Sequence, residues 1–249
     1  MIRKTILITG ASSGLGEGLA REFAAAGRDL ALCARRLERL EALRAELLAA
    51  HPGIRIALRV LDVNDHPQVF AVFEAFAAEL GAIDRVIVNA GVGTGRRVGT
   101  GHFASNLQTA QTNFVAALAQ CEAAVALFRR QNHGHLVTVA SVSAMRGLPR
   151  HLTTYAATKA GLATLTEGIR AELLATPIRV TTVFPGYIST ELNAGAKHLP
   201  FVVSSAAGCR RLFTAIEKEP ATAFVPAWPW TLLAWAMRWM PLRWVARLV

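Results

Sequence analysis

The 249-residue sequence predicts one α/β domain built on a doubly wound parallel sheet. Short apolar runs rich in Val, Ile and Leu alternate with patterns of helical period, an order typical of parallel strands joined by helices. The first run, 5–9, ends in a glycine-rich turn that opens a helical pattern. Later runs end in small or polar residues, which places polar groups at one edge of the sheet. The length fits a single large domain.

Composition limits the classes of protein that need to be considered. With 53% hydrophobic and 18% charged residues the chain is globular. The net charge of +10 favours an anionic partner, such as nucleic acid, an anionic cofactor or an anionic membrane. Nucleic acid is disfavoured because the chain has no zinc-finger spacing, no RNA-binding aromatic motif and no long basic block. His133 and His135 have no partner at metal-ligand spacing, so we expect no metal site and interpret them as loop or strand-edge residues.

Cysteine usage and the start of the chain predict a cytoplasmic protein. Cys33, Cys121 and Cys209 are odd in number and far apart, which is typical of reduced core residues in an intracellular protein. The first residues lead directly into a strand-like run and lack the apolar segment and cleavage site of a signal peptide.

The glycine-rich turn after the first strand is a candidate pyrophosphate site. Glycines let the backbone approach a phosphate closely, and the start of the next helix supplies free N–H groups and a partial positive charge. The spacing GxxxGxG without a following lysine disfavours a nucleotide-hydrolysing P-loop, and the helix should end near Gly27. The candidate residues of this turn are Gly10, Ser12, Ser13, Gly14, Leu15 and Gly16.

Two arginines after the second strand, 30–34, favour NADP over NAD. In a dinucleotide fold this strand end faces the adenosine ribose, where an acidic residue suits free hydroxyls and a basic one suits a 2′-phosphate. Arg35 and Arg36 occupy this place, and cations in the first turn of a helix cost about 0.3–1 kcal/mol unless an anion visits. The alternative is that both arginines are simply solvated, and this alternative is more plausible for Arg36 than for Arg35.

The remaining elements continue the alternation. We expect strands at 54–61, 84–88, 135–140, 178–184 and 223–226, with helices at 69–80 and 106–130 and from Ser204 or Ser205 to about 218. No clear period emerges over 191–203, which suits a loop that covers the substrate. Strand ends on one edge of a parallel sheet line the ligand crevice, which places a second group of residues near Gly10. They are Asp62, Val63, Asn89, Ala90 and Gly91.

Tyr155 and Lys159 lie four residues apart in a segment of helical character, so they share one helix face. An adjacent ammonium favours the phenolate and lowers the pKa of a tyrosine toward the range that general acid/base catalysis needs. Taken alone, the pair is more simply interpreted as solvated surface residues, and only the surrounding motifs outweigh that interpretation.

Together these motifs resemble the short-chain dehydrogenases/reductases. The resemblance runs from about residue 4 to residue 225 and implies a single Rossmann domain in which hydride passes between a nicotinamide and a carbonyl or alcohol carbon. It also implies a homodimer or homotetramer, consistent with an alanine-rich helix over 155–163. The motifs that carry it occur in the family's order: Thr9–Gly16, Asp62-Val63, Asn89-Ala90-Gly91, Asn113, Ser141, Tyr155, Lys159 and Pro185–Thr190.

The resemblance also implies roles for individual residues. Tyr155 would exchange a proton with the substrate oxygen, and Lys159 would lower the tyrosine pKa and hold the nicotinamide ribose. Ser141 would hydrogen-bond the substrate oxygen, and Asn113 would position a water in a proton relay to the lysine. Ser141 lies one residue farther from Tyr155 than is usual; we prefer it to Ser143 and place the extra residue after Pro149. The segment expected over the nicotinamide contains Pro185, Gly186, Ile188 and Thr190.

Residues 227–249 lie outside the family's core, which we assign to residues 1–226. All five tryptophans fall in this segment, and no acidic residue follows Glu219. Prolines interrupt it, so a transmembrane anchor is disfavoured. Two alternatives remain: an apolar flap over the substrate pocket or a neighbouring subunit, which is slightly favoured, or a basic segment over 228–249 lying in a membrane interface. Either hints at an apolar substrate.

The sequence therefore predicts an NADP-dependent carbonyl reductase or alcohol dehydrogenase. One alternative is a non-catalytic dinucleotide-binding sensor or membrane-peripheral scaffold, although a pure binder has no need of Tyr155. Another is an epimerase or dehydratase that regenerates its cofactor internally.

Overall fold

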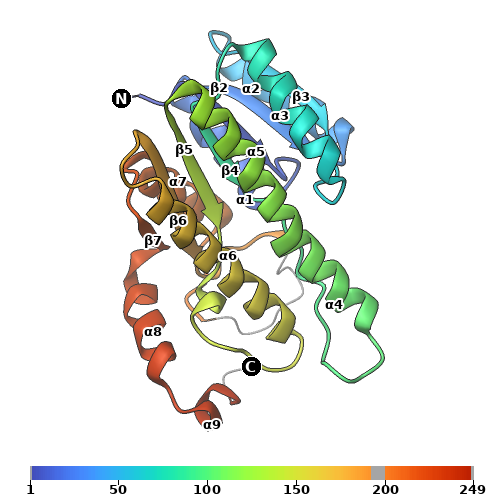
Figure 1. Ribbon diagram of the computed structural model, residues 1–249, viewed down its shortest axis with the longest axis vertical. Helices are drawn as coiled ribbons and strands as arrows, with labels where there is room; N and C mark the ends of the chain where they lie inside the picture. Colours follow the sequence, from blue (N-terminus) through green and yellow to red (C-terminus); the bar gives the residue numbers. More distant parts are fainter. Residues whose placement is uncertain (1, 192–199, 248–249) are drawn as a thin grey trace.

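The computed structural model describes residues 2–191 and 200–247. Its core is a seven-stranded sheet in the order β3-β2-β1-β4-β5-β6-β7, and every neighbouring pair of strands is parallel (Figure 1). The chain therefore folds as the predicted doubly wound sheet, with the order reversing between β1 and β4. The strands are β1 (Thr5–Thr9), β2 (Asp29–Ala34), β3 (Ile56–Val60), β4 (Arg85–Val88), β5 (Gly134–Val139), β6 (Ile178–Pro185) and β7 (Thr222–Val225).

Helices cover both faces of the sheet, which explains why its central strands are apolar on both sides. Alternate residues of β1 belong to different cores, because Leu7 packs on one face while Ile6 and Ile8 pack on the other. The first face is covered by α3 (His66–Leu80), α5 (Ala116–Gln131) and α6 (Leu152–Glu172), and the second by α1 (Gly14–Ala25), α2 (Leu37–Ala50) and α7 (Ser205–Glu217).

Local signals set the helix boundaries. The side chain of Asp65 caps α3 by accepting a hydrogen bond from the backbone N–H of Gln68, so this helix begins before the predicted residue 69. Ser204 caps α7 by accepting from the backbone N–H of Ala207, as predicted.

Cys33, Cys121 and Cys209 are buried free thiols, and burial raises the pKa of Cys121 to about 12.

The predicted long helix 106–130 contains a local change of winding. It consists of α4 (Phe103–Ala110), a π-helical turn at Gln111–Val115 and α5. Such turns often occur at functional sites. Here the turn directs the Asn113 side chain to the backbone of Val92, from whose N–H it accepts (2.8 Å) and to whose carbonyl it donates (2.9 Å).

A buried ionic network lies at the amino-terminal edge of the sheet. Arg85 of β4 is 1% exposed and pairs with Glu217 and Glu219. Its Nε donates to Nδ1 of His135 (2.8 Å), so Nε2 of this imidazole carries the proton and donates to Thr181 (2.8 Å). His135 is therefore a fully buried residue at the start of β5, within the predicted strand 135–140.

The C-terminal segment forms α8 (Ala227–Trp239) and α9 (Leu242–Val245), which extend beyond the β7 edge of the sheet (Figure 1). Its buried residues pack on the same chain: Trp230 lies against Gly186, and Val245 against Leu148 and Ala156. Among residues 2–191 and 200–247, no helix has the length and apolar character needed to cross a membrane.

Candidate active site

The glycine-rich turn joins β1 to α1 at the carboxyl edge of the sheet. Gly10 has φ +65°, a left-handed conformation that glycine adopts without strain. A Cβ on Gly16 would lie 2.4 Å from the Gly10 carbonyl oxygen, so only glycine fits where the helix meets the turn. Ser13 precedes α1 in extended conformation, and its side chain does not cap the helix. The turn therefore presents backbone N–H groups at a helix start, which suits an anionic ligand.

The ends of β1 and β4 are tied together beside this turn. The Thr9 hydroxyl accepts from the backbone N–H groups of Asn89 (3.1 Å) and Ala90 (3.2 Å). The Asn89 side chain donates back to the Thr9 carbonyl (2.9 Å). Gly91 follows, and a Cβ there would lie 3.2 Å from the Asn113 side-chain oxygen. The predicted strand-end residues of β4 thus lie beside Gly10 and Asn113.

Asp62 and Val63 follow β3, the strand at one edge of the sheet. Asp62 is half-buried, and its carboxylate accepts from the backbone and side chain of Asn64 (3.0 Å each). Val63 is buried within the core. These contacts hold the loop after β3 in place and leave Asp62 at the carboxyl edge of the sheet.

Arg36, rather than Arg35, reaches the glycine-rich turn. Its guanidinium donates to the hydroxyls of Ser12 (3.1 Å) and Ser13 (2.7 Å), whereas Arg35 is exposed. Arg36 and Arg39 also flank Glu191, at 3.7 and 2.7 Å respectively. The Arg39 guanidinium is the main cause that lowers the pKa of Glu191. Two guanidinium groups therefore meet one carboxylate beside the turn.

Ser141, Tyr155 and Lys159 come together where β5 ends and α6 begins. The Ser141 hydroxyl hydrogen-bonds Tyr155 and accepts from the backbone N–H of Ser143 (3.1 Å). The Lys159 ammonium donates to the Val139 carbonyl (2.7 Å) and lies 5.9 Å from the centre of the Tyr155 ring. The loop between Ser141 and Tyr155 contains Arg150, with φ +62°, directly after Pro149.

Burial controls the electrostatics of the Tyr155 phenol in the free chain. It raises the pKa of Tyr155, and the hydrogen bond with Ser141 offsets part of this increase. The expected lowering by Lys159 does not dominate here, because the ammonium is directed at the Val139 carbonyl. Tyr155 is therefore a protonated phenol at neutral pH, the form that a general acid requires.

Burial also lowers the pKa of Lys159, to about 8, because a charged ammonium loses its hydration there. Compared with the ordinary value of 10.5, this corresponds to a cost of about 3 kcal/mol for keeping the charge in the folded state. Between these two pH values the unfolded chain binds the proton and the folded chain does not, so the contribution of Lys159 to stability rises with pH.

We therefore expect Lys159→Met to change the pH dependence of stability. Because the wild type recovers the cost of its buried charge as pH rises from about 8 toward 10.5, the variant's stability relative to wild type should fall by about 2–3 kcal/mol over this window. Urea unfolding of both proteins at pH 7 and pH 10 measures the difference. Lys218→Met, at an exposed position, is the control. A pH-independent difference for Lys159→Met would contradict the expectation.

The Pro185–Thr190 segment and the C-terminal segment meet beside Tyr155. Burial is the main cause that raises the Tyr155 pKa, and the nearby Tyr187 raises it further. The Trp230 ring packs edge-on against Tyr187, at 5.4 Å between centroids, and directly against Gly186. Within the described residues, the buried Nε1 of Trp230 has no hydrogen-bond partner. The indole N–H is therefore a buried donor packed against Gly186.

The other predicted residues of this segment border the glycine-rich turn and α7. Pro185 ends β6, and Ile188 is buried against Gly208 of α7. Thr190 lies near Gly14, where a Cβ would come within 3.6 Å of the Thr190 side chain. Of the expected covering loop, 192–199 lies outside the described residues, and Val203 pairs with Ile188.

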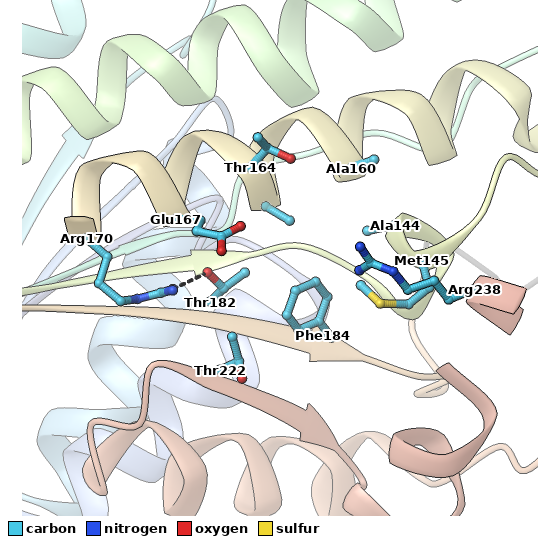
Figure 2. A pocket seen from close by; sticks show the side chains of 11 residues that line it. Ala144, Met145, Ala160, Thr164, Glu167, Arg170, Thr182, Phe184, Thr222 and Arg238 are labelled. Atoms are coloured by element: carbon cyan, nitrogen blue, oxygen red, sulfur yellow. Dashed lines mark hydrogen bonds between the residues drawn. The ribbon is translucent and has the colours of Figure 1, made fainter. Parts of the chain in front are cut away.

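A pocket of about 220 Å³ lies between α6, β6 and β7 and is distinct from this site (Figure 2). Arg170 and Glu167 of α6 line it together with Thr182, to which Arg170 donates a hydrogen bond of 2.9 Å. Arg238 of α8 closes the other end. Ser141, Tyr155 and Lys159 are not among its lining residues, so this pocket does not define the candidate active site.

Sequence reasoning missed several residues that shape the site. The sequence indicates Thr9 only as part of a motif, yet its hydroxyl joins two strand ends. Arg39 lies one helical turn beyond Arg36, a spacing that could have indicated it. Tyr187 and Trp230 were indicated only as members of the Pro185–Thr190 motif and of the C-terminal segment. Glu191 carried no sequence signal for its position, since its contacts join distant parts of the chain.

Comparison with known proteins identifies the family. The family model for short chain dehydrogenases matches residues 4–199. An uncharacterized oxidoreductase of Mycobacterium tuberculosis is 52% identical over 97% of this chain and 95% of its own length. The chain therefore belongs to the short-chain dehydrogenase/reductase family and is an oxidoreductase of that family, whose fold binds nicotinamide cofactors.

Two further relatives are informative. The NADP-dependent 3-hydroxy acid dehydrogenase of Schizosaccharomyces pombe is 33% identical over 78% of this chain and 75% of its own length. The crystal structure of levodione reductase superposes with a TM-score of 0.78 at 26% identity, covering 89% of this chain and 95% of that one.

Proposed function

We propose that the chain is an NADP(H)-dependent oxidoreductase that interconverts a carbonyl and an alcohol, with Tyr155 as the general acid/base. The observation that carries this proposal is the placement of Tyr155 beside Ser141 and beside buried Lys159, whose ammonium lies 5.9 Å from the phenol ring, at the same sheet edge as the glycine-rich turn. A phenol that can give or take a proton thus lies next to a site suited to a dinucleotide.

The residues present fit a nicotinamide dinucleotide. The helix start after Gly10 suits its pyrophosphate, and Lys159 lies close to Gly91, where a Cβ would come within 3.7 Å of the ammonium. When bound, the nicotinamide supplies or accepts the hydride. The strand-end residues Asp62, Val63, Asn89 and Ala90 would border the adenine and ribose.

In the proposed reduction, the Tyr155 hydroxyl gives its proton to the substrate carbonyl oxygen. Ser141 hydrogen-bonds the phenol and would also donate to the substrate oxygen as charge develops there. The ammonium of Lys159 stabilises the phenolate that remains. In the reverse direction the phenolate accepts the alcohol proton. Asn113 acts as a positioning residue, because its side chain holds the backbone of Val92 beside Gly91.

The preference for NADP rests on the arginine pair at the turn. Arg36 and Arg39 already bind one carboxylate, that of Glu191. A 2′-phosphate would carry more charge and more acceptor oxygens than this carboxylate, so it should displace it. The name of the Schizosaccharomyces pombe relative, an NADP-dependent dehydrogenase, supports the same choice.

We expect Arg36→Asp to weaken NADPH binding by about 10- to 100-fold, because a charge-assisted contact to phosphate is replaced by repulsion. NADH binding should stay within about threefold of wild type or improve. Titration calorimetry with both cofactors measures this. Arg35→Asp, which makes the same charge change at the exposed neighbour, is the matched control. Equal losses in the two variants would point to net charge instead of a specific site.

The proposed substrate is an apolar carbonyl or alcohol. Tyr187 and Trp230 border the catalytic tyrosine, and Phe201 packs edge-on against Trp230 at 6.1 Å. Three aromatic rings on the substrate side favour an apolar molecule with one polar group. Assembly into a homodimer or homotetramer and a location in the cytoplasm stay predictions.

The experiment that tests the proposal measures cofactor binding and turnover in one preparation. NADPH is titrated calorimetrically, and its oxidation is then followed with aliphatic, aromatic and polycyclic ketones and aldehydes. Tight binding with net NADPH consumption supports the reductase. Binding without turnover across the panel would favour the non-catalytic sensor, and product formation without net NADPH consumption would favour an epimerase or dehydratase.

A further inference from the structure

The C-terminal segment has two apolar faces, of which the protein covers only one. Trp230 and Ala234 are buried on the inner face of α8, and Met237 packs near Leu148 and Val245. On the outer face, Leu232, Trp235 and Trp239 follow the spacing i, i+3, i+7, so their side chains align along one stripe. Trp235 is 66% exposed and Trp239 72% exposed. An additional partner is needed to cover this stripe.

Exposed apolar side chains also precede and follow the stripe in the sequence. Trp228 precedes it with 77% exposure, and Leu242 and Trp244 of α9 follow it with 66% and 55%. Four of the five tryptophans of the protein are therefore largely exposed in one segment. Large apolar side chains exposed in such number within one segment mark an interaction site. Tryptophan is also the side chain best suited to a boundary between apolar and polar surroundings.

The charges of the segment restrict the partner. Arg238, Arg243 and Arg247 are exposed, and no aspartate or glutamate follows Glu219. A symmetric dimer formed through this face would set the arginines of one copy against those of the other, because an isologous interface uses the same patch on both subunits. An anionic surface instead complements them. The 13 residues of α8 are too few to span a bilayer, so the helix would lie in its plane.

We propose that the surface formed by Trp228, Leu232, Trp235, Trp239, Leu242 and Trp244, together with Arg243 and Arg247, docks the protein on anionic lipid bilayers. The tryptophans enter the headgroup boundary and the arginines bind lipid phosphates. The inner face of the same segment packs against Tyr187 and Leu148, close to Tyr155. Docking would therefore place the substrate side of the catalytic site beside the membrane, from which an apolar substrate can enter.

All five tryptophans lie in this segment, so intrinsic fluorescence reports docking without any label. The full-length protein is mixed with vesicles of phosphatidylcholine alone or mixed with phosphatidylglycerol, and binding is followed by vesicle co-sedimentation and tryptophan emission. We expect binding and a blue shift with the mixed vesicles, weaker binding with phosphatidylcholine alone, and loss of the difference at high salt. Absence of binding to the mixed vesicles overturns the proposal.

Charge-reversal and tryptophan variants test whether this surface makes the lipid contact. The double change Arg243→Glu/Arg247→Glu should weaken binding to mixed vesicles about 100-fold, roughly tenfold for each reversal. Arg129→Glu/Arg130→Glu, with the same charge change on exposed positions of α5, should leave it within a few-fold. Trp235→Ser/Trp239→Ser should abolish binding while circular dichroism and NADPH oxidation in solution are retained.

Light scattering on Trp235→Ser/Trp239→Ser tests whether a second copy of the chain, instead of lipid, covers the stripe. An unchanged mass with lost vesicle binding supports the lipid surface. A fall in mass relative to wild type would mean that a second copy covers the stripe and would overturn the proposal. Equal vesicle binding by the wild type and this variant would overturn it as well, because the stripe would then be unnecessary. Apart from the NADPH-oxidation control, none of these measurements depends on the proposed reaction.

Discussion

Replacing Tyr155 by phenylalanine is expected to lower carbonyl reduction by about 10²- to 10⁴-fold, the usual contribution of a positioned general acid. The ring would still fill its half-buried place, so only the hydroxyl and its hydrogen bond with Ser141 are lost. We expect NADPH affinity to change less than threefold, because in the proposed site the glycine-rich turn and the arginines would hold the dinucleotide. Steady-state turnover and titration calorimetry on the same preparation measure both effects.

The chain supplies a matched control for this experiment. It has two tyrosines, and the second, Tyr187, contacts Trp230 instead of reaching Ser141. Tyr187→Phe removes an equivalent hydroxyl from the same neighbourhood and should change turnover by less than about tenfold. If the two variants lost activity equally, or if Tyr155→Phe kept most of it, Tyr155 would not be the proton donor.

The pH dependence supplies a second readout. Because burial raises the pKa of Tyr155, the phenol keeps its proton across the neutral range. The rate of carbonyl reduction in the wild type should therefore be flat near neutrality and fall as pH rises above this pKa, since the acid is then lost. Alcohol oxidation should show the opposite slope. The residual activity of Tyr155→Phe should show neither of these two pH dependences.

The repeating pattern of the chain made the fold predictable. Parallel strands covered on both faces are apolar along their whole length, and the stretch Thr5–Thr9 was assigned with its correct boundaries for this reason. The glycine turn and the Tyr155/Lys159 spacing are local signals too, because only a few neighbouring residues determine them. Elements whose stability depends on adjacent residues can thus be predicted from sequence.

Features that depend on distant contacts could not be predicted in this way. Arg35 and Arg36 are equivalent in sequence, and the direction of the chain after β2 decides that Arg36 meets Ser12 and Ser13. The π-helical turn at Asn113 depends on its pairing with the backbone of Val92, 21 residues away. Trp230 and Trp235 lie on different faces of α8, one buried and the other exposed. The contact of Trp230 with Gly186 determines which face is buried, and the sequence alone does not show this contact.

The Arg85 network is the clearest example, and removing Arg85 is expected to cause the largest loss of stability. The partners lie far from it in sequence: His135 is 50 residues away and Glu217 is 132. Sequence reasoning placed Arg85 in a strand without explaining its charge. In the fold, burial alone would raise the pKa of Glu217, but hydrogen bonds with Arg85 and Arg28 outweigh burial and keep it below its ordinary value.

We expect Arg85→Ala to lower the free energy of unfolding by about 3–5 kcal/mol, the usual cost of removing one partner from a buried ion pair. Glu217 and Glu219 would keep Arg28 and Arg3 but lose their shared buried cation, and Nδ1 of His135 would lose its donor. Urea unfolding measures the change. Arg130→Ala, which breaks an exposed pair with Glu74, should cost less than about 1 kcal/mol. NADPH binding by the folded variant should be retained, since the network lies at the opposite edge of the sheet from the glycine-rich turn.

At acid pH, the stability of the wild type should reveal the effect of the same network. Burial, reinforced by Arg85, lowers the pKa of His135 well below its ordinary value, so the folded state keeps this imidazole neutral. As pH falls below about 6.5, the unfolded chain binds a proton that the folded chain does not, and stability decreases. In His135→Gln that part of the acid sensitivity should be absent, whatever the variant's stability at neutral pH. If wild type and His135→Gln lost stability in parallel between about pH 6.5 and about pH 5, the imidazole would not be the group responsible, and the assignment of its neutral, Arg85-bound state would have to be abandoned.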